Sequence, residues 1–298
     1  MLKGFRCPEF GESAGRANTI SYCVKHCSVP CTAPHLLVSI LEQEKANPHK
    51  GKMISVTQIT GGCKRKTFLE RTVDYYVTPD KKLPTFRGSL IHEVIASIDP
   101  KIAKRYKWVV EEHLELPVKT KSGAWTLSGT LDFYEAARKT IYDLKTLQDY
   151  AVTKMVMGKE EGTWSPNIPD SYVKQLNLYR YMAHQLKKFR VDRLRLQVIG
   201  FGRLFLTGTT VKYGAKKDLQ TYTIPDVPIL KNAVIEDWIH TEGDLWYRIL
   251  FKNENAPVRD ETYKWLCYSC PFYKSEFCPN PEEEARQQTL TRAKTFDV

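Results

Sequence analysis

The chain has 298 residues, enough for one large domain or for a core domain with an appendage. Hydrophobic residues make up 42% and charged residues 27%, and no uninterrupted apolar run approaches the roughly 18 residues of a membrane helix. The N-terminus also lacks the apolar core of a signal peptide, so we expect a cytoplasmic protein without a membrane partner. The formal net charge of +11 favours polyanionic partners, because lysines and arginines that neutralise phosphates release condensed counterions.

The predicted elements begin with an N-terminal extension, residues 1–50, which holds four cysteines and a short helix at about 35–46. A basic amphipathic stretch at 63–76 is predicted to be helical, and another helix follows at 90–98. Further strands are predicted at 108–118, 125–134, 140–147, 194–206 and 220–224, and further helices at 172–186 and 229–251. This order indicates an α/β fold with a mixed central sheet flanked by helices.

Two adjacent predicted strands carry acidic residues that would face each other. If residues 136–139 form the loop between these strands, Asp132 lies opposite Asp143, and Lys145 shares their face. Like charges about 5 Å apart are destabilising unless a cation neutralises them, and carboxylate oxygens suit Mg²⁺ or Mn²⁺. The lysine could orient an attacking water or stabilise charge on a phosphate. The alternative is a solvent-facing hairpin with a surface Asp–Lys pair.

The motifs of this region occur in a familiar order. Gly-Thr-Leu-Asp at 129–132 followed by Asp-Leu-Lys at 143–145 resembles the bipartite signature of PD-(D/E)XK nucleases. Upstream, the segment around His92 resembles the histidine helix of the RecB-like exonuclease branch. Downstream, residues 175–179 resemble its Gln-x-x-x-Tyr helix, whose two named residues share one side. The resemblance runs from about residue 54 to the end and implies a restriction-endonuclease-like fold.

The resemblance also implies roles for individual residues. In that family a histidine and two acidic residues bind the metal, a lysine serves the attacking water, and a glutamine and a tyrosine hold the site and its DNA. These roles fall on His92, Asp132, Asp143, Lys145, Gln175 and Tyr179. Many relatives have Glu where this chain has Asp143, so the ligand here is one methylene shorter. Glu93 and Glu112 are additional acidic candidates.

Cysteines form a second group of candidate ligands near the C-terminus. Cys267, Cys270 and Cys278 need a fourth thiolate to close a metal site, and Cys63 is the natural candidate. Four thiolates suit either zinc or a [4Fe–4S] cluster. The resemblance implies the iron–sulfur cluster, which occurs in CRISPR-associated RecB-like exonucleases and in AddB-type helicase–nucleases. It would close a nuclease domain spanning 51–298 and contribute folding free energy directly.

The cysteines of the N-terminal extension lie outside the resemblance. Three of them are four residues apart, which is helical spacing, and they have a fourth within reach: Cys7, Cys23, Cys27 and Cys31. We favour a small structural Zn²⁺ site, with His26 and His35 as alternative ligands. Unligated buried cysteines and a second iron–sulfur cluster are the other two interpretations.

The resulting hypothesis is a DNA nuclease that hydrolyses phosphodiester bonds with Mg²⁺ or Mn²⁺, acting as an exonuclease on single-stranded ends. Aromatic side chains could stack on unpaired bases, and the candidates are Tyr75, Tyr76, Trp164 and Tyr172. The alternatives are a non-cleaving DNA-binding adaptor in a recombination or CRISPR-adaptation complex, and a structure-specific endonuclease. The chain has no helicase motif, so a helicase or recombination protein would supply any unwinding.

Overall fold

The computed structural model describes residues 51–77, 83–148, 151, 155, 168–201, 227–254, 257, 267 and 270–278, and the backbone alone of 2–6, 17–19 and 221–224. The chain divides into two compact units. The sheet unit comprises His49–Thr60 and Pro84–Asn253. The cysteine unit comprises Met1–Pro48, Gly61–Leu83 and Glu254–Val298. The division at residue 50 that the sequence suggested stays a prediction.

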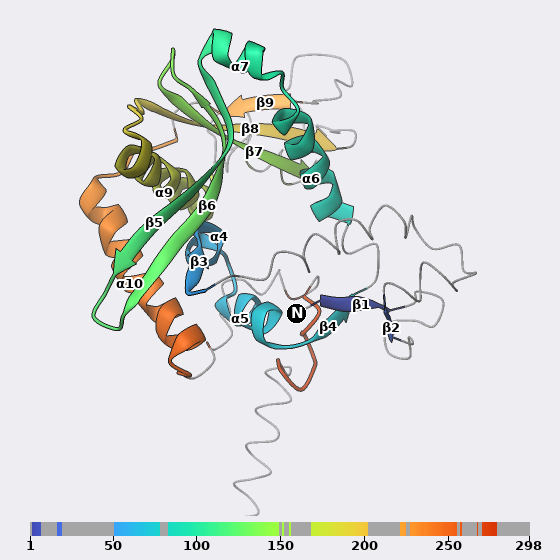
Figure 1. Ribbon diagram of the computed structural model, residues 1–298. Coiled ribbons are helices and arrows are strands. Elements are labelled where there is room, and N and C mark those ends of the chain that lie inside the picture. Colours follow the sequence, from blue (N-terminus) through green and yellow to red (C-terminus); the bar gives the residue numbers. More distant parts are fainter. Residues whose placement is uncertain are drawn as a thin grey trace, which may run out of the picture. The chain divides into compact units, whose positions relative to one another are not determined.

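The sheet unit is built on a six-stranded mixed sheet (Figure 1). Its strands are β3 (Met53–Ser55), β5 (Trp108–Lys119), β6 (Ala124–Glu135), β7 (Thr140–Gln148), β8 (Arg193–Phe201) and β9 (Thr221–Ile224). Strand β6 is shared: it pairs antiparallel with β5 along its whole length, parallel with β3 near its start, and antiparallel with β7 at its end. Strands β7 and β8 run parallel and β9 closes the sheet antiparallel, so the expected mixed α/β architecture is confirmed.

Helices connect and flank these strands. They are α4 (Val56–Thr60), α6 (Leu83–Ala96), α7 (Pro100–Tyr106), α9 (Asp170–Lys187) and α10 (Asn232–Phe251). Helix α9 links the parallel strands β7 and β8, as a parallel connection requires. Figure 1 shows α10 beside the turn between β5 and β6, away from α6 and α7. Among the helices that the structure describes, none is long and apolar enough to cross a membrane.

Helix α9 forms the centre of the hydrophobic core. Its Leu176, Met182 and Ala183 are completely buried, following the spacing that predicted the helix. The buried Asn177 side chain donates to the carbonyl of Pro228 and accepts from the N–H of Leu230, at 2.8 and 2.9 Å. The buried amide therefore has hydrogen-bond partners, and it connects α9 to the segment that precedes α10.

Three boundaries differ from the sequence prediction. The helix expected at 63–76 is α5 (Lys64–Thr72) followed by strand β4 (Tyr75–Val77), because aromatic and β-branched residues favour a strand there. Helix α6 begins at Leu83, before the expected residue 90. The basic run after it was not predicted as an element; it forms α7, which starts with an Asp99 cap and a proline in the first turn.

The cysteine unit contains a three-stranded sheet and a small apolar core. The strands β1 (Leu2–Arg6), β2 (Ala17–Thr19) and β4 have the order β2-β1-β4. Leu69 of α5, Phe272 and Cys278 are buried together, and Tyr75 meets Phe272 edge-on at 5.0 Å between ring centroids. Tyr75, which the sequence offered as a residue that could stack on bases, is partly buried and packs against this core.

Candidate active site

The acidic hairpin has the register that the sequence predicted. Residues 136–139 form the turn, and the observed pairs are Glu135 with Thr140, Tyr134 with Ile141, and Phe133 with Tyr142. Described pairing of β6 with β7 stops there, one position before Asp132 and Asp143. Instead, the Asp132 Oδ2 atom accepts the backbone N–H of Leu144 at 2.7 Å. A side chain replaces a backbone partner where the strands separate, which fixes the orientation of Asp132.

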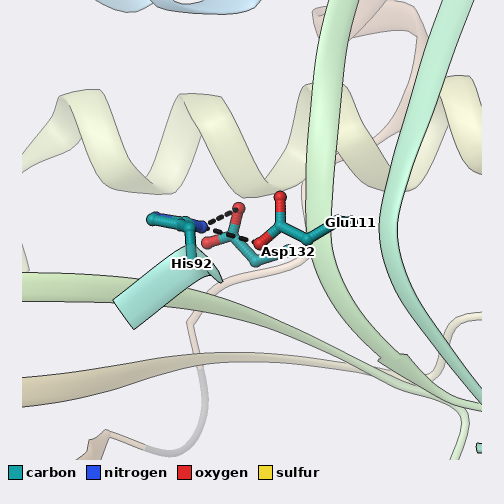
Figure 2. A group of neighbouring side chains, drawn as sticks. All are labelled: His92, Glu111 and Asp132. Atoms are coloured by element: carbon teal, nitrogen blue, oxygen red, sulfur yellow. Dashed lines mark hydrogen bonds and ion pairs between the residues drawn. The ribbon is translucent and has the colours of Figure 1, made fainter. Parts of the chain in front are cut away.

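A histidine and two carboxylates converge beside this hairpin (Figure 2). His92 comes from α6, Glu111 from β5 and Asp132 from β6. The His92 Nδ1 atom is 2.7 Å from Glu111 Oε1 and 3.8 Å from Asp132 Oδ1. One ligand atom from each residue lies within 4.8 Å of the others, so the three could hold one metal ion. Carboxylate oxygens suit Mg²⁺ or Mn²⁺, whereas an imidazole nitrogen suits transition metals, so the mixed set fits Mn²⁺ better than Mg²⁺.

Glu111 is the member of this group that sequence reasoning missed. Its neighbour Glu112, a candidate from the sequence, forms an ion pair with Lys187 at 2.5 Å instead. The β5–β6 register pairs Val110 with Phe133 and Glu112 with Leu131, which places Glu111 opposite Asp132. A prediction of that pairing, in addition to the β6–β7 hairpin, would have found it. The other candidate, Glu93, is exposed on α6.

Asp143 is held by the lysine of the motif. It is 1% exposed, and its Oδ2 atom lies 2.7 Å from Lys145 Nζ. Within the described part of the chain, Asp143 Oδ1 has no hydrogen-bond partner. The ammonium of Lys145 also lies 5.1 Å from the centre of the Tyr172 ring. The sequence grouped Asp143 with His92 and Asp132 as metal ligands; the structure groups those two with Glu111 and pairs Asp143 with Lys145.

Burial and mutual repulsion shift the pKa values of these acids. Burial, and then the charge of Asp143, raise the pKa of Asp132 to about 7, against the Leu144 N–H, which lowers it. Burial also raises the pKa of Asp143, although Lys145 opposes the shift. The hydrogen bond to Glu111 raises the pKa of His92 against the effect of burial. Without a cation the site therefore retains protons, and a bound cation would displace them.

Lys145 keeps its charge in this environment. Burial alone would lower its pKa, but the charge and hydrogen bond of Asp143 outweigh burial and hold the pKa above the usual value. The side chain is therefore an ammonium at neutral pH. It can donate hydrogen bonds and stabilise negative charge, but it is not a base.

The glutamine and tyrosine of the predicted motif contact each other on α9. The Gln175 Nε2 group donates to the Tyr179 hydroxyl at 3.3 Å. Tyr179 is 4% exposed, and burial raises the pKa of its hydroxyl. A β-carbon at Gly129 would come within 2.7 Å of the Tyr179 ring, so this tyrosine can approach β6 because Gly129 has no side chain.

Four cysteines line one small cavity in the cysteine unit. They are Cys63, Cys267, Cys270 and Cys278, and the rest of the lining is formed by Lys66, Leu69, Phe272 and Tyr273. None of the four is in a disulfide, and burial raises the pKa of the Cys270 thiol. The structure thus brings together the four thiols that the sequence grouped. The other predicted cysteine group, Cys7, Cys23, Cys27 and Cys31, lies outside the described residues, as does Trp164.

Comparisons with known proteins give distant structural likenesses. No protein-family model matches the chain, and no curated protein matches it. The crystal structure of SSO0001 aligns with a TM-score of 0.48 and 16% identity, covering 81% of this chain and 94% of that one. A structure from Eubacterium rectale, named as a candidate exonuclease, aligns with a TM-score of 0.31 and 13% identity over 73% of this chain and 74% of that one. Neither likeness assigns a function.

Proposed function

We propose that this protein is a metal-dependent DNA nuclease of the PD-(D/E)XK type. The observation that carries the proposal is the convergence of His92, Glu111 and Asp132, with the Asp143–Lys145 pair on the neighbouring strand. Phosphodiester hydrolysis needs a cation site and a nearby positive charge, and the His92 group and the partly buried Lys145 supply both.

The fit of a cation is supported by the donor set and by one orphaned atom. The three converging side chains offer one imidazole nitrogen and two carboxylates, a set that fits Mn²⁺ better than Mg²⁺. Asp143 Oδ1 is buried and has no hydrogen-bond partner in the described part of the chain. A buried anionic oxygen of this kind is costly unless something positive satisfies it.

The residues divide the chemistry between them. A divalent cation bound here would supply a water of lowered pKa and neutralise charge on the phosphate. His92, Glu111 and Asp132 would hold that cation, and the Leu144 N–H keeps Asp132 in position. Lys145 donates to the attacking water or to the phosphate oxygen on which negative charge develops. Asp143 keeps the ammonium in position through the 2.7 Å contact.

The mode of attack is proposed from the resemblance of the four motifs to the RecB-like branch. We expect exonuclease action on single-stranded DNA ends. A helicase, recombination or CRISPR-adaptation partner would present such ends. The net charge of +11 supports a polyanionic substrate of either mode.

The cysteine cavity supports a [4Fe–4S] cluster as the second cofactor. Four thiols around one cavity suit either a zinc ion or a [4Fe–4S] cluster, and the resemblance of the motifs favours the cluster. The start of α5 at Lys64, next to Cys63, and the nearby Lys66 favour an anionic four-thiolate centre of either kind.

Digestion of end-labelled linear and circular single-stranded DNA with Mn²⁺ tests the proposal, using protein purified without oxygen. We expect wild type to degrade linear DNA and to spare circles, and Lys145→Ala to lose activity by at least about a hundredfold. Cleaved circles would make the enzyme an endonuclease. If wild type binds DNA but never cuts it, the nuclease assignment is wrong and the adaptor reading replaces it.

The matched variants Glu111→Gln and Glu112→Gln distinguish the loss of a metal ligand from the loss of one negative charge on the strand. Both remove one charge from adjacent positions of β5, but only Glu111 belongs to the converging group. We expect Glu111→Gln to weaken Mn²⁺ binding about 10- to 100-fold, measured by calorimetry, and to reduce cleavage with it. Glu112→Gln should leave both unchanged. Equal effects of the two variants would contradict the assignment of Glu111.

A further inference from the structure

Helix α7 and the start of β5 carry exposed aromatic and basic side chains together. Of residues 101–107, all but Ala103 are exposed, and none of the residues of α7 is buried. Tyr106 is 49% exposed and stacks on Trp108, with 5.0 Å between ring centroids and 23° between planes. We call the group of Lys101, Lys104, Arg105, Tyr106 and Trp108 the α7 platform.

The aromatic contacts continue from the α7 platform toward the acidic hairpin. Trp108 meets Phe133 at 5.3 Å, and Phe133 meets Tyr142 at 5.8 Å. Phe133 directly follows Asp132, and Tyr142 directly precedes Asp143. Trp108 is three residues before Glu111 on the same strand, a distance of about 10 Å. Adjacent residues of a strand point to opposite faces, so these rings pack on the face of β6 and β7 opposite Asp132 and Asp143.

Charge on the α7 platform favours an anionic ligand. The α7 platform has three basic residues, and Lys107 adds a fourth positive charge. The two acidic residues next to this segment, Asp99 and Glu135, already have partners. Asp99 accepts the backbone N–H of Lys101 at 2.7 Å as the helix cap. Glu135, which pairs with Trp108 across the strands, is bound by Arg138 at 2.9 Å. The arginine of the α7 platform, Arg105, lies 5.6 Å from the centre of the Tyr106 ring.

An exposed tyrosine that stacks on a tryptophan, with an arginine near its ring, can recognise the faces of unpaired bases. Aromatic rings and guanidinium planes both stack on nucleobases, and surrounding lysines follow the phosphates. A paired duplex offers such rings only at its ends. We propose that the α7 platform binds single-stranded DNA, with Tyr106 stacking on a base and Lys101, Lys104 and Arg105 contacting phosphates.

This inference deepens the proposed function and rests on it for the fate of the strand. The test measures binding apart from cleavage, by fluorescence anisotropy of a labelled oligothymidylate with EDTA present and full-length protein. We expect Tyr106→Ala to bind the oligothymidylate about tenfold more weakly, and a blunt duplex within about twofold of wild type. Tyr106→Phe, which keeps the ring, should bind both as wild type does.

Charge and position are tested by two further variants. Lys104→Ala should weaken both DNA forms and reduce the slope of log affinity against log salt by about one. Val234→Ala is the matched control, because Val234 is also exposed, at 40%, but lies on α10, apart from α7 in Figure 1. It should bind like wild type. Urea unfolding of each variant verifies that the chain is folded, as expected for exposed positions.

Two outcomes overturn the proposal: Tyr106→Ala binding the oligothymidylate as tightly as wild type, or losing duplex binding equally. The first would leave α7 as a surface for a protein partner. Failure here is distinct from failure of the proposed function. Wild type that cuts DNA with Mn²⁺ while Tyr106→Ala binds normally refutes the α7 platform alone. Wild type that never cuts, with binding that depends on Tyr106, refutes the nuclease alone.

Discussion

Glu111 has a backbone conformation that a glutamate rarely adopts in a strand. Its φ of +48° lies in the left-handed region, which costs about 1–3 kcal/mol for a residue other than glycine. The conformation accompanies the 2.7 Å contact between its carboxylate and His92. Strain of this kind is retained where surrounding contacts hold it, and such places are often functional sites. The strain thus agrees with a role for Glu111 in holding a cation.

The pKa of Asp132 predicts how Mn²⁺ binding depends on pH. At low pH the metal-free site holds protons on Asp132, whose pKa is about 7, and on His92, whose pKa is also raised. A cation must displace these protons, so the affinity should increase as the pH rises from about 5 and level off above about 7. Calorimetric titrations with Mn²⁺ across this range measure the effect. An affinity that does not vary with pH would contradict it.

The same protons stabilise the metal-free fold in acid. Between the ordinary carboxyl pKa of 3.8 and about 7, the folded state binds more protons at Asp132 than the unfolded state does. The free energy of unfolding must therefore fall as the pH rises through this window. Asp132→Asn should flatten that slope in urea titrations with EDTA present. A slope equal to that of wild type would show that Asp132 titrates normally.

At the scale of elements, two helix glycines differ in the space that surrounds them, so alanine should have opposite effects at the two positions. Replacing a glycine inside a helix by alanine ordinarily stabilises it by about 0.5–1 kcal/mol. At Gly88 of α6 a β-carbon would find Thr146 Oγ1 at 3.5 Å, an ordinary contact. At Gly243 of α10 it would overlap the six-membered ring of the buried Trp125. The close packing of α10 on β6 therefore depends on Gly243.

Alanine at these two positions should change the free energy of unfolding in opposite directions. Gly243→Ala is expected to lower it by about 1–2 kcal/mol, because overpacking a rigid core outweighs the helix preference. Gly88→Ala should raise it by about 0.5–1 kcal/mol. Urea unfolding followed by circular dichroism measures both. A stabilising Gly243→Ala would mean that Trp125 can move aside.

The elements also show how far local pattern determined structure. The hairpin of β6 and β7 was predicted with its turn and register, because period-two patterns and a short connection fix a hairpin. The change from α5 to β4 was missed because the apolar residues of the short strand continue the helical spacing of the stretch before it. Helix α7 was missed because the segment is mostly charged and exposed and lacks the apolar face by which a helix is predicted.

At the scale of the whole molecule, the candidate cofactors belong to different compact units. The cysteine cavity lies in the cysteine unit and the His92 group in the sheet unit. Cys63→Ser should abolish bound iron and visible absorption in protein purified without oxygen, and destabilise the cysteine unit, because the cluster contributes folding free energy. Mn²⁺ affinity should remain that of wild type. Zinc in place of iron, or a parallel loss of Mn²⁺ binding, would contradict this prediction.

The sequence by itself determined the mixed α/β class, the acidic hairpin and the pairing of distant cysteines in one group. Each depends on local periodicity, or on residue types whose chemistry needs partners. Tertiary structure alone decided the rest. Whether Glu111 or Glu112 faces His92 depends on the register of β5 with β6 and on the left-handed backbone of Glu111. Asp143 contacts Lys145, and Glu111 contacts His92, next to the point where the described pairing of β6 with β7 ends. No window of sequence contains that arrangement, since it arises from three strands and a helix packing together.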